Sequence, residues 1–285
     1  MSTLVQLVEC PRDAMQGWKH QIPTEAKIEY IQSLLEVGFD TIDFGSFVSP
    51  KAIPQMADTA VVAGRLNMQH SRSKLLAIVA NERGAREAVA FDAISYLGFP
   101  FSISETFQQR NTHSSIWESL ERVEAIQRIC THASKHLVVY ISMAFGNPYG
   151  DAYTQEIAYE WAGKLADAGI QTISLADTVG LAGAGQVESM TRFLVQQLAG
   201  VQIGVHLHST PANWEEKVEA AFRSGCNRFD GALKGIGGCP MAGDALVGNI
   251  NMEGMIGYFG AHDVLPPLNP EALQKSLQLA GKIFQ

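Results

Sequence analysis

Cysteine is scarce in this 285-residue chain, which contains only Cys10, Cys130, Cys226 and Cys239. No two of them have a Cys-x-x-Cys spacing, so the sequence predicts neither a disulfide framework nor a cysteine-rich zinc site. Isolated thiols of this kind are typical of reduced proteins, and we therefore expect a cytoplasmic location.

Long apolar runs are also missing. No stretch approaches the roughly 20 apolar residues that a membrane-spanning helix needs, so we expect no membrane partner. The first ten residues, MSTLVQLVEC, enter a strand-like segment directly, which predicts that no signal or transit peptide is present.

Basic residues are outnumbered, with 21 Lys and Arg against 29 Asp and Glu, which gives a formal net charge of -8. A nucleic-acid partner would require a basic face, so the composition argues against one. An anionic small molecule remains compatible with this balance if cationic side chains are concentrated at its binding site.

Short apolar segments alternate with longer amphipathic ones along the whole chain. The eight predicted strands are Leu4–Glu9, Thr41–Phe44, Leu75–Val79, Ala93–Leu97, Leu137–Ser142, Thr172–Leu175, Ile203–His208 and Arg228–Ala232. Helix-length segments separate them, among them the amphipathic run that follows Thr24 and ends at Gly38. A second such run opens after Thr154 and ends at Gly169.

Eight alternating units predict a single-domain α/β fold, the (β/α)₈ or TIM barrel, over residues 1–285, with helices near the C-terminus covering the barrel. No Pro-, Ser- or charge-rich linker divides the series. The alternative is an open doubly wound sheet, but the first strand is not followed by the GxGxxG motif of dinucleotide-binding sheets.

Polar residues gather where the predicted strands end, the edge at which (β/α)₈ barrels carry their reactive groups. His206 and His208 form the sharpest pattern, because residues i and i+2 of a strand point to the same face. Two histidines of this kind can simply form hydrogen bonds in the core. With Asp13 entering the same mouth, however, the pattern favours a site for one divalent ion such as Mg²⁺ or Mn²⁺.

Four further residues have both a structural and a functional interpretation. Arg12 forms a surface ion pair or holds a substrate anion or oxyanion. Asp177 caps the next helix or acts in catalysis, and Asn249 is a turn residue or a metal ligand. Cys239 is an inert buried thiol or, in the segment GIGGCPMAGD, a reactive group on a mobile loop.

Seven segments together resemble 3-hydroxy-3-methylglutaryl-CoA lyases, a family of metal-dependent TIM-barrel enzymes, of which this chain would be a divergent member. The segments are PRDAMQ at 11–16, SFVSPKAIPQMAD at 46–58, SETFQQRNTHSSIWES at 104–119, ISLADTVG at 173–180, VHLHS at 205–209, GIGGCPMA at 235–242 and GNINMEG at 248–254. The resemblance covers nearly the whole chain in order.

The resemblance implies roles for individual residues. The metal ligands would be Asp13, His206, His208 and Asn249. Arg12, Gln16 and Lys19 would bind the acyl-CoA substrate. The catalytic set would comprise Arg12, Cys239, Asp43, Asp177, His206 and Glu253. The family also suggests a homodimer.

The implied reaction is a retro-Claisen cleavage that yields acetyl-CoA and acetoacetate. Asp13, His206 or Asp43 would take the hydroxyl proton, Arg12 would stabilise the enolate, and Cys239 or a group acting with it would protonate the enolate carbon. Because Asp43 stands where the family has glutamate, a related branched 3-hydroxyacyl-CoA is a further expected substrate. The alternatives are a Claisen-type condensing synthase or carboxyltransferase, and a catalytically silent ligand-binding relative.

Overall fold

The computed structural model describes residues 4–238 and 248–285, and its sheet is a closed barrel. The strands are β1 (Gln6–Glu9), β2 (Thr41–Ser46), β3 (Lys74–Ile78), β4 (Ile94–Ser102), β5 (His136–Ser142), β6 (Thr172–Asp177), β7 (Gln202–Leu207) and β8 (Arg228–Gly231). They follow one another in order around the barrel, and each pairs in parallel with its neighbours. The predicted (β/α)₈ barrel is confirmed, and the open sheet is excluded.

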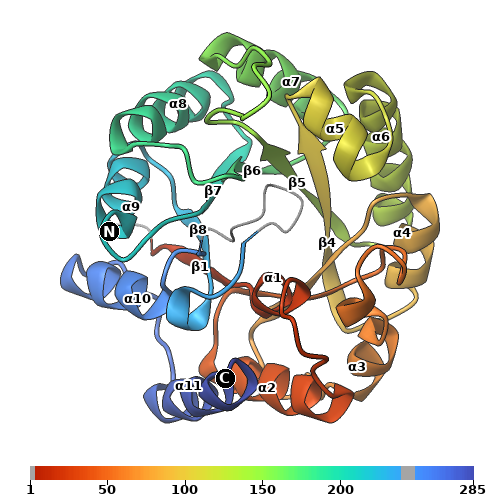
Figure 1. The fold of residues 1–285 in the computed structure, drawn as a ribbon, viewed down its shortest axis with the longest axis vertical. Helices are drawn as coiled ribbons and strands as arrows, with labels where there is room; N and C mark the ends of the chain where they lie inside the picture. The colour runs from red at the N-terminus through yellow and green to blue at the C-terminus, as the bar shows by residue number, and fades with distance from the viewer. Residues whose placement is uncertain (1–3, 239–247) are drawn as a thin grey trace.

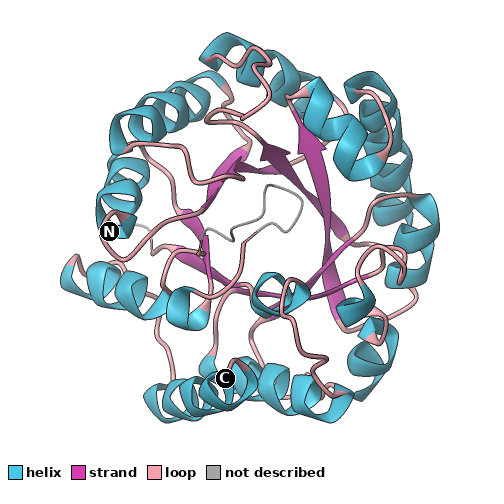
Figure 2. Ribbon diagram, viewed as in Figure 1, coloured by secondary structure: helices cyan, strands magenta, loops and turns pink. Residues whose placement is uncertain are grey.

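Helices form the outer ring, as Figures 1 and 2 show. They are α1 (Pro11–Gln16), α2 (Thr24–Val37), α3 (Thr59–Arg65), α4 (Glu82–Val89), α5 (Glu105–Thr112), α6 (Ile116–His132), α7 (Gln155–Asp167), α8 (Ala184–Gln197), α9 (Trp214–Arg223), α10 (Met252–Ala261) and α11 (Pro270–Ile283). Two 3₁₀ turns, η1 (Pro54–Met56) and η2 (Leu233–Gly235), lie between them. The last helix, α11, packs beside α2, so the C-terminus lies next to the segment that follows β1.

The helix ends follow local chemistry. Thr154 caps α7, since its hydroxyl accepts a hydrogen bond from Ile157 N at 3.2 Å. The prediction for α2 was wrong by one residue, because Pro23 is the N-cap and Thr24 lies inside the helix. The Thr24 hydroxyl instead donates to Asp58 at 2.7 Å. Gly38 ends α2 in the left-handed conformation, at φ 87°.

Apolar side chains are divided between two regions of different size. The main core lies between the strands and the surrounding helices, whereas a small separate cluster inside the barrel consists of Leu76, Val138 and Tyr140. The rest of the interior towards the mouth is polar and includes Asp43, His206 and Asp230, all buried. The barrel therefore excludes water from a polar centre, where electrostatic interactions are stronger than in solvent.

Glu9 is a charged residue that the fold buries completely at the end of β1. Its Oε1 accepts a hydrogen bond from Leu233 N at 3.0 Å, while Oε2 has no partner among the described residues. Burial raises the pKa of Glu9 well above its ordinary value, and the nearby Glu253 adds to this effect.

We predict that Glu9→Gln stabilises the protein at weakly alkaline pH. A carboxyl whose pKa is raised by folding contributes full stability below its unfolded pKa, and that stability is lost as pH rises through the folded pKa. A tenfold difference in proton affinity corresponds to about 1.4 kcal/mol, and glutamine keeps the acceptor oxygen without the charge.

The measurement is the free energy of unfolding in denaturant across a pH series. The control is Glu29→Gln, which removes a carboxyl group of the same kind from an exposed position on α2. A Glu9→Gln variant with the same pH dependence as the wild type would contradict this account.

Candidate metal centre and active site

The first three predicted ligands meet at the carboxyl end of the barrel. One ligand atom each from Asp13, His206 and His208 lies within 4.8 Å of the other two. The imidazole rings of His206, in β7, and His208, directly after it, are 5.3 Å apart between centroids, as expected for alternate residues that leave a strand on one face. A single ion could be bound by all three groups.

Asp13 reaches the mouth because Pro11 begins the short helix α1 directly after β1. Proline is favoured at this first position, and an acidic residue in the first turn faces the positive end of the helix dipole. Burial alone would raise the pKa of Asp13, but the nearby Arg12, His206 and His208 hold it well below its usual range. The carboxylate is therefore ionised and suited to bind a cation.

Asn249 is brought to the same cluster by backbone pairing, since it lies opposite His208 in an isolated antiparallel bridge. Its Nδ2 donates to Asp13 Oδ2 at 2.8 Å. Asn249 Oδ1 and His208 Nδ1 are both buried, and neither has a hydrogen-bond partner among the described residues. Unpaired buried polar atoms are costly, so the presence of two of them in neighbouring residues of this cluster fits a bound cation.

The two histidines differ in their electrostatic environment. Burial and the neighbouring His206 lower the pKa of His208 to about 4, so His208 is neutral at physiological pH and can be a ligand. Burial also works against the charged form of His206, but the hydrogen bond and charge of Asp230 outweigh it and raise that pKa. His206 Nδ1 lies 3.2 Å from Asp230 Oδ2, which leaves Nε2 for an ion.

Arg12 and Asp43 form a buried ion pair beside the cluster. Arg12 donates from Nε to Asp43 Oδ2 at 3.0 Å, from Nη2 to the same carboxylate, and from Nη1 to Asp13 at 2.8 Å. Burial opposes the Arg12 charge, but Asp43 and Asp13 outweigh it and raise the pKa of Arg12. Of the two interpretations of Arg12, a surface ion pair does not apply, because the guanidinium is buried.

A β-bulge positions Asp43. The register between β2 and β3 shifts after Asp43, so that Gly45 rather than Phe44 pairs with the next residue of β3. Bulges of this kind redirect side chains beside functional sites. Glycine is required at position 45, because a Cβ there would lie 2.5 Å from Thr59 Cγ2.

The remaining predicted residues lie in different surroundings. Gln16 joins the cluster, where its Nε2 donates to Asp13 at 2.8 Å. Lys19 is exposed in the segment between α1 and α2. Glu253 in α10 accepts a hydrogen bond from Lys234 N at 2.9 Å. Cys239 lies outside the described residues.

Asp177 has a structural partner that the sequence did not indicate. Its Oδ2 lies 2.9 Å from Lys217 Nζ, and both side chains are buried. Lys217 also donates to the carbonyl oxygen of His208 at 2.7 Å. Asp177 does not cap α8, whose N-cap is Gly183. The ion pair joins the ends of β6 and β7 to α9 and holds the backbone at His208.

Asp230 and Lys217 were both missed by sequence reasoning. Asp230 follows Arg228 at i+2 on a short strand, and that alternation was the only available sign that it points inward. Lys217 occupies a helix in the run WEEKVEAAFR, where a lysine ordinarily faces solvent.

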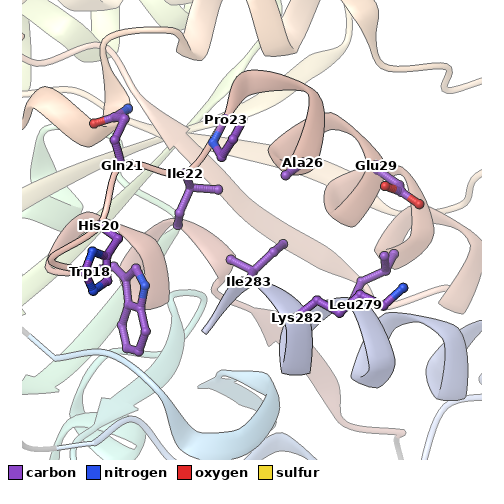
Figure 3. Close-up of a pocket in the computed structure, with 10 residues that line it drawn as sticks. All are labelled: Trp18, His20, Gln21, Ile22, Pro23, Ala26, Glu29, Leu279, Lys282 and Ile283. Atoms are coloured by element: carbon purple, nitrogen blue, oxygen red, sulfur yellow. The ribbon is translucent and has the colours of Figure 1, made fainter. Parts of the chain in front are cut away.

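A separate cavity of about 250 Å³ opens near the C-terminus, between the α1–α2 segment and α11. Its walls include Trp18, His20 and Ile22 on one side and Lys282 and Ile283 on the other, as Figure 3 shows. None of the metal-cluster residues lines it. Lys19 lies in sequence between two of its lining residues.

The fold and these side chains together define a (β/α)₈-barrel protein with a candidate divalent-cation centre at the carboxyl ends of its strands. Residues 5–279 match the HMGL-like family model. The chain belongs to the HMGL-like family, and it is a lyase.

Curated relatives and solved structures agree with this assignment. The chain is 34% identical to the cytoplasmic 3-hydroxy-3-methylglutaryl-CoA lyase of Rattus norvegicus, over 88% of this chain and 73% of the relative. It is 32% identical to the mitochondrial hydroxymethylglutaryl-CoA lyase of Mus musculus, over 99% and 85% respectively. The HMG-CoA lyase of Acinetobacter baumannii, solved with coenzyme A and 3-methylmalate, superimposes with a TM-score of 0.91 at 28% identity, covering 100% of this chain and 93% of that one.

These relatives include both cytoplasmic and mitochondrial proteins, so the predicted cytoplasmic location stays a prediction, as does the homodimer. Among the described residues, no helix combines the length and apolar character needed to cross a bilayer.

We predict that Asp230→Asn weakens Mn²⁺ binding by about 10- to 100-fold, the usual effect of removing the carboxylate that orients a metal-binding histidine. Isothermal titration of the metal-free protein measures the affinity. Asp151→Asn is the matched control, because Asp151 binds Ser104 and Thr106 and does not contact the cluster. Equal Mn²⁺ affinities in Asp230→Asn and the wild type would show that Asp230 does not orient His206.

We also predict that Lys217→Met lowers the free energy of unfolding by about 3–5 kcal/mol, because Asp177 would keep a buried charge without its partner. The double variant Lys217→Met with Asp177→Leu should recover much of this loss. Urea unfolding measures both effects. A single variant that loses less than about 1 kcal/mol would mean that water or another group readily replaces Lys217.

Proposed function

We propose that this protein is a metal-dependent carbon–carbon lyase that cleaves 3-hydroxy-3-methylglutaryl-CoA, or a related branched 3-hydroxyacyl-CoA, to acetyl-CoA and the matching keto acid. The observation that carries the proposal is the convergence of Asp13, His206, His208 and Asn249 beside the buried Arg12–Asp43 pair. The relatives named as HMG-CoA lyases support the substrate class.

The ion would be held by Asp13, His206 and His208, with Asn249 Oδ1 as a fourth donor. This mixed nitrogen and oxygen set suits Mg²⁺ or Mn²⁺ better than a closed thiolate site does. A divalent ion bound there would polarise the tertiary hydroxyl and a neighbouring oxygen of the substrate and lower the pKa of that hydroxyl.

Asp43 is the best-placed proton acceptor of the three candidates. Asp13 and His206 would be engaged as metal donors, whereas Asp43 lies beside the cluster without belonging to it. We propose that Asp43 takes the hydroxyl proton, after which the bond between the carbinol carbon and the acetyl thioester carbon breaks.

Arg12 is suited to stabilise the enolate that leaves. A guanidinium has five N–H donors, and three of those on Arg12 are used by Asp43 and Asp13, so two remain for a substrate oxygen. The two carboxylates also fix the orientation of the guanidinium before substrate arrives, and such preorganisation is the main source of electrostatic catalysis.

Cys239 is proposed to protonate the enolate carbon, alone or with a neighbouring group. Asp177 and Glu253 keep their proposed catalytic roles, although both carboxylates also hold backbone or side-chain groups of their own surroundings.

For the coenzyme A portion, we propose that Gln16 and Lys19 lie on the path of the thioester arm and that the cavity beside α11 takes part of it. The cavity combines an apolar wall of Trp18, Ile22 and Ile283 with the cationic Lys282. An apolar wall beside a cation suits the coenzyme A portion of the substrate, which carries both apolar and phosphate groups. The solved relative with bound coenzyme A supports an acyl-CoA substrate for the family.

We expect purified protein with Mg²⁺ or Mn²⁺ to release acetyl-CoA from 3-hydroxy-3-methylglutaryl-CoA or from one member of a panel of branched 3-hydroxyacyl-CoA thioesters. Arg12→Lys should lower kcat by about 100- to 1000-fold, because lysine keeps the charge but loses the fork of donors. A coupled assay for acetyl-CoA, run beside Cys239→Ala, gives the measurement.

Release of acetyl-CoA from no thioester of the panel would overturn the proposal. Consumption of acetyl-CoA with a keto acid, in place of its release, would identify the condensing synthase instead. The absence of turnover in either direction would favour a ligand-binding relative.

A further inference from the structure

A second group of potential ligands lies next to the candidate metal centre. One ligand atom each from Cys10, His206 and Asp230 lies within 4.8 Å of the other two. The barrel register explains this arrangement. His206 pairs with Asp230 across β7 and β8, and Asp230 pairs with Val8 across β8 and β1. Cys10 comes two residues after Val8 and therefore points to the same face.

The hydrogen bonds of this group are incomplete. Asp230 is almost wholly buried, and its Oδ1 has no partner among the described residues. Among the described residues, the Cys10 thiol has a single hydrogen-bond partner, the carbonyl of Val8, at a sulfur–oxygen distance of 3.7 Å. The Asp230–His206 contact thus uses one carboxylate oxygen, and the second oxygen of Asp230 is left without a hydrogen bond beside a weakly bonded thiol.

The electrostatic field at this point favours a cation. Burial raises the pKa of the Cys10 thiol well above its ordinary value, and Asp230, Asp43 and Asp13 raise it further against the single opposing charge of Arg12. The buried guanidinium of Arg228 also lies near Asp230, so three carboxylates face two guanidinium groups and a net negative charge remains to stabilise a cation.

We propose that Cys10, His206 and Asp230 form a second cation site, which takes a thiophilic divalent ion such as Zn²⁺ or Cd²⁺ and excludes the ion of the Asp13 centre. A sulfur, nitrogen and oxygen donor set selects these ions over Mg²⁺ and Mn²⁺. The geometry of the three residues supports the site. That an ion bound there would inhibit the enzyme, by excluding the ion of the Asp13 centre, rests on the proposed lyase function.

Exclusion follows from the shared imidazole. His206 Nδ1 faces Asp230, so it donates its proton there while Nε2 is free for the Asp13 centre. To bind an ion beside Cys10, Nδ1 must present its lone pair, and the proton moves to Nε2, which can then no longer be a ligand. The imidazole stays neutral throughout. The Cys10 S–H bond breaks, a sulfur–metal bond forms, and one proton is released to solvent for each ion bound.

The test is a titration of the metal-free protein with Cd²⁺, followed by the sulfur-to-cadmium charge-transfer band in the ultraviolet and by proton release in weak buffer. We expect a band and one proton per site in the wild type, and the loss of both in Cys10→Ala. Three controls separate this thiol from the others: Cys130→Ala and Cys226→Ala each remove another buried thiol, and Cys239→Ala removes the proposed catalytic one. All three should keep the band.

Competition tests the shared histidine. Preloading with Mn²⁺ should raise the Cd²⁺ concentration needed for half of the band in proportion to the Mn²⁺ present. Asp230→Asn, which keeps the size of the side chain, should weaken Cd²⁺ binding even if Cys10→Ala folds poorly.

A full band in folded Cys10→Ala would overturn the site, and Cd²⁺ binding that is indifferent to Mn²⁺ would overturn the exclusion. Both readouts need no substrate, so they remain decisive whatever the outcome of the acetyl-CoA assay.

Discussion

The carboxylate of Asp13 accepts four hydrogen bonds at the barrel mouth. Its Oδ1 accepts hydrogen bonds from Arg12 and Gln16, both in α1, and its Oδ2 accepts from Asn249 and from the backbone N–H of Gly238. The last two residues follow β8 and come more than two hundred positions later in the chain. Closure of the barrel between β1 and β8 makes this meeting possible, since it brings the first strand beside the last.

Charge in the mouth is organised around the same carboxylate. Asp13 and Asp43 share the single guanidinium of Arg12, which leaves excess negative charge in a region from which water is excluded. Buried charges of this kind are costly unless they are paired, and a divalent cation beside Asp13 would provide the missing compensation. The buried charge of Asp177, at the carboxyl end of β6, is by contrast paired directly with Lys217.

The barrel could be predicted because its signal is repeated eight times. Each strand is an apolar run, and the sequence places all eight within a few residues of their observed bounds. The largest error is in β4, which was expected to end at Leu97 but continues to Ser102. Gly98 and Pro100 have low strand propensity, and a Cβ on Gly98 would crowd the Ile78 side chain, at 2.6 Å from its Cδ1. Tertiary packing decided the length of this strand against local propensity.

The site was predictable only where its residues form a local pattern. His206 and His208 are two apart at the end of one strand, and Asp13 follows another strand after a short interval, so the strand ends bring them together. Asp230, Lys217 and Cys10 carry no such pattern, because their roles depend on which strands and helices become neighbours. Their contacts join β7 to β8, α9 to β6 and β1 to β8, and these are tertiary relations that no short sequence window contains.

The glycines before Cys239 have a structural role that the sequence did not indicate. The mobile loop predicted from them falls on residues outside the described ones, whereas Gly237 itself packs closely on the metal cluster. Gly237 and Gly238 both have positive φ. A Cβ on Gly237 would lie 2.3 Å from Asn249 Nδ2 and 3.0 Å from the backbone oxygen of Asp13. Only glycine lets this segment approach closely enough for Gly238 N to donate to Asp13 at 3.1 Å. The segment that precedes Cys239 thus packs directly on two of the proposed ligands. A side chain at position 237 would therefore displace both Asn249 and Asp13.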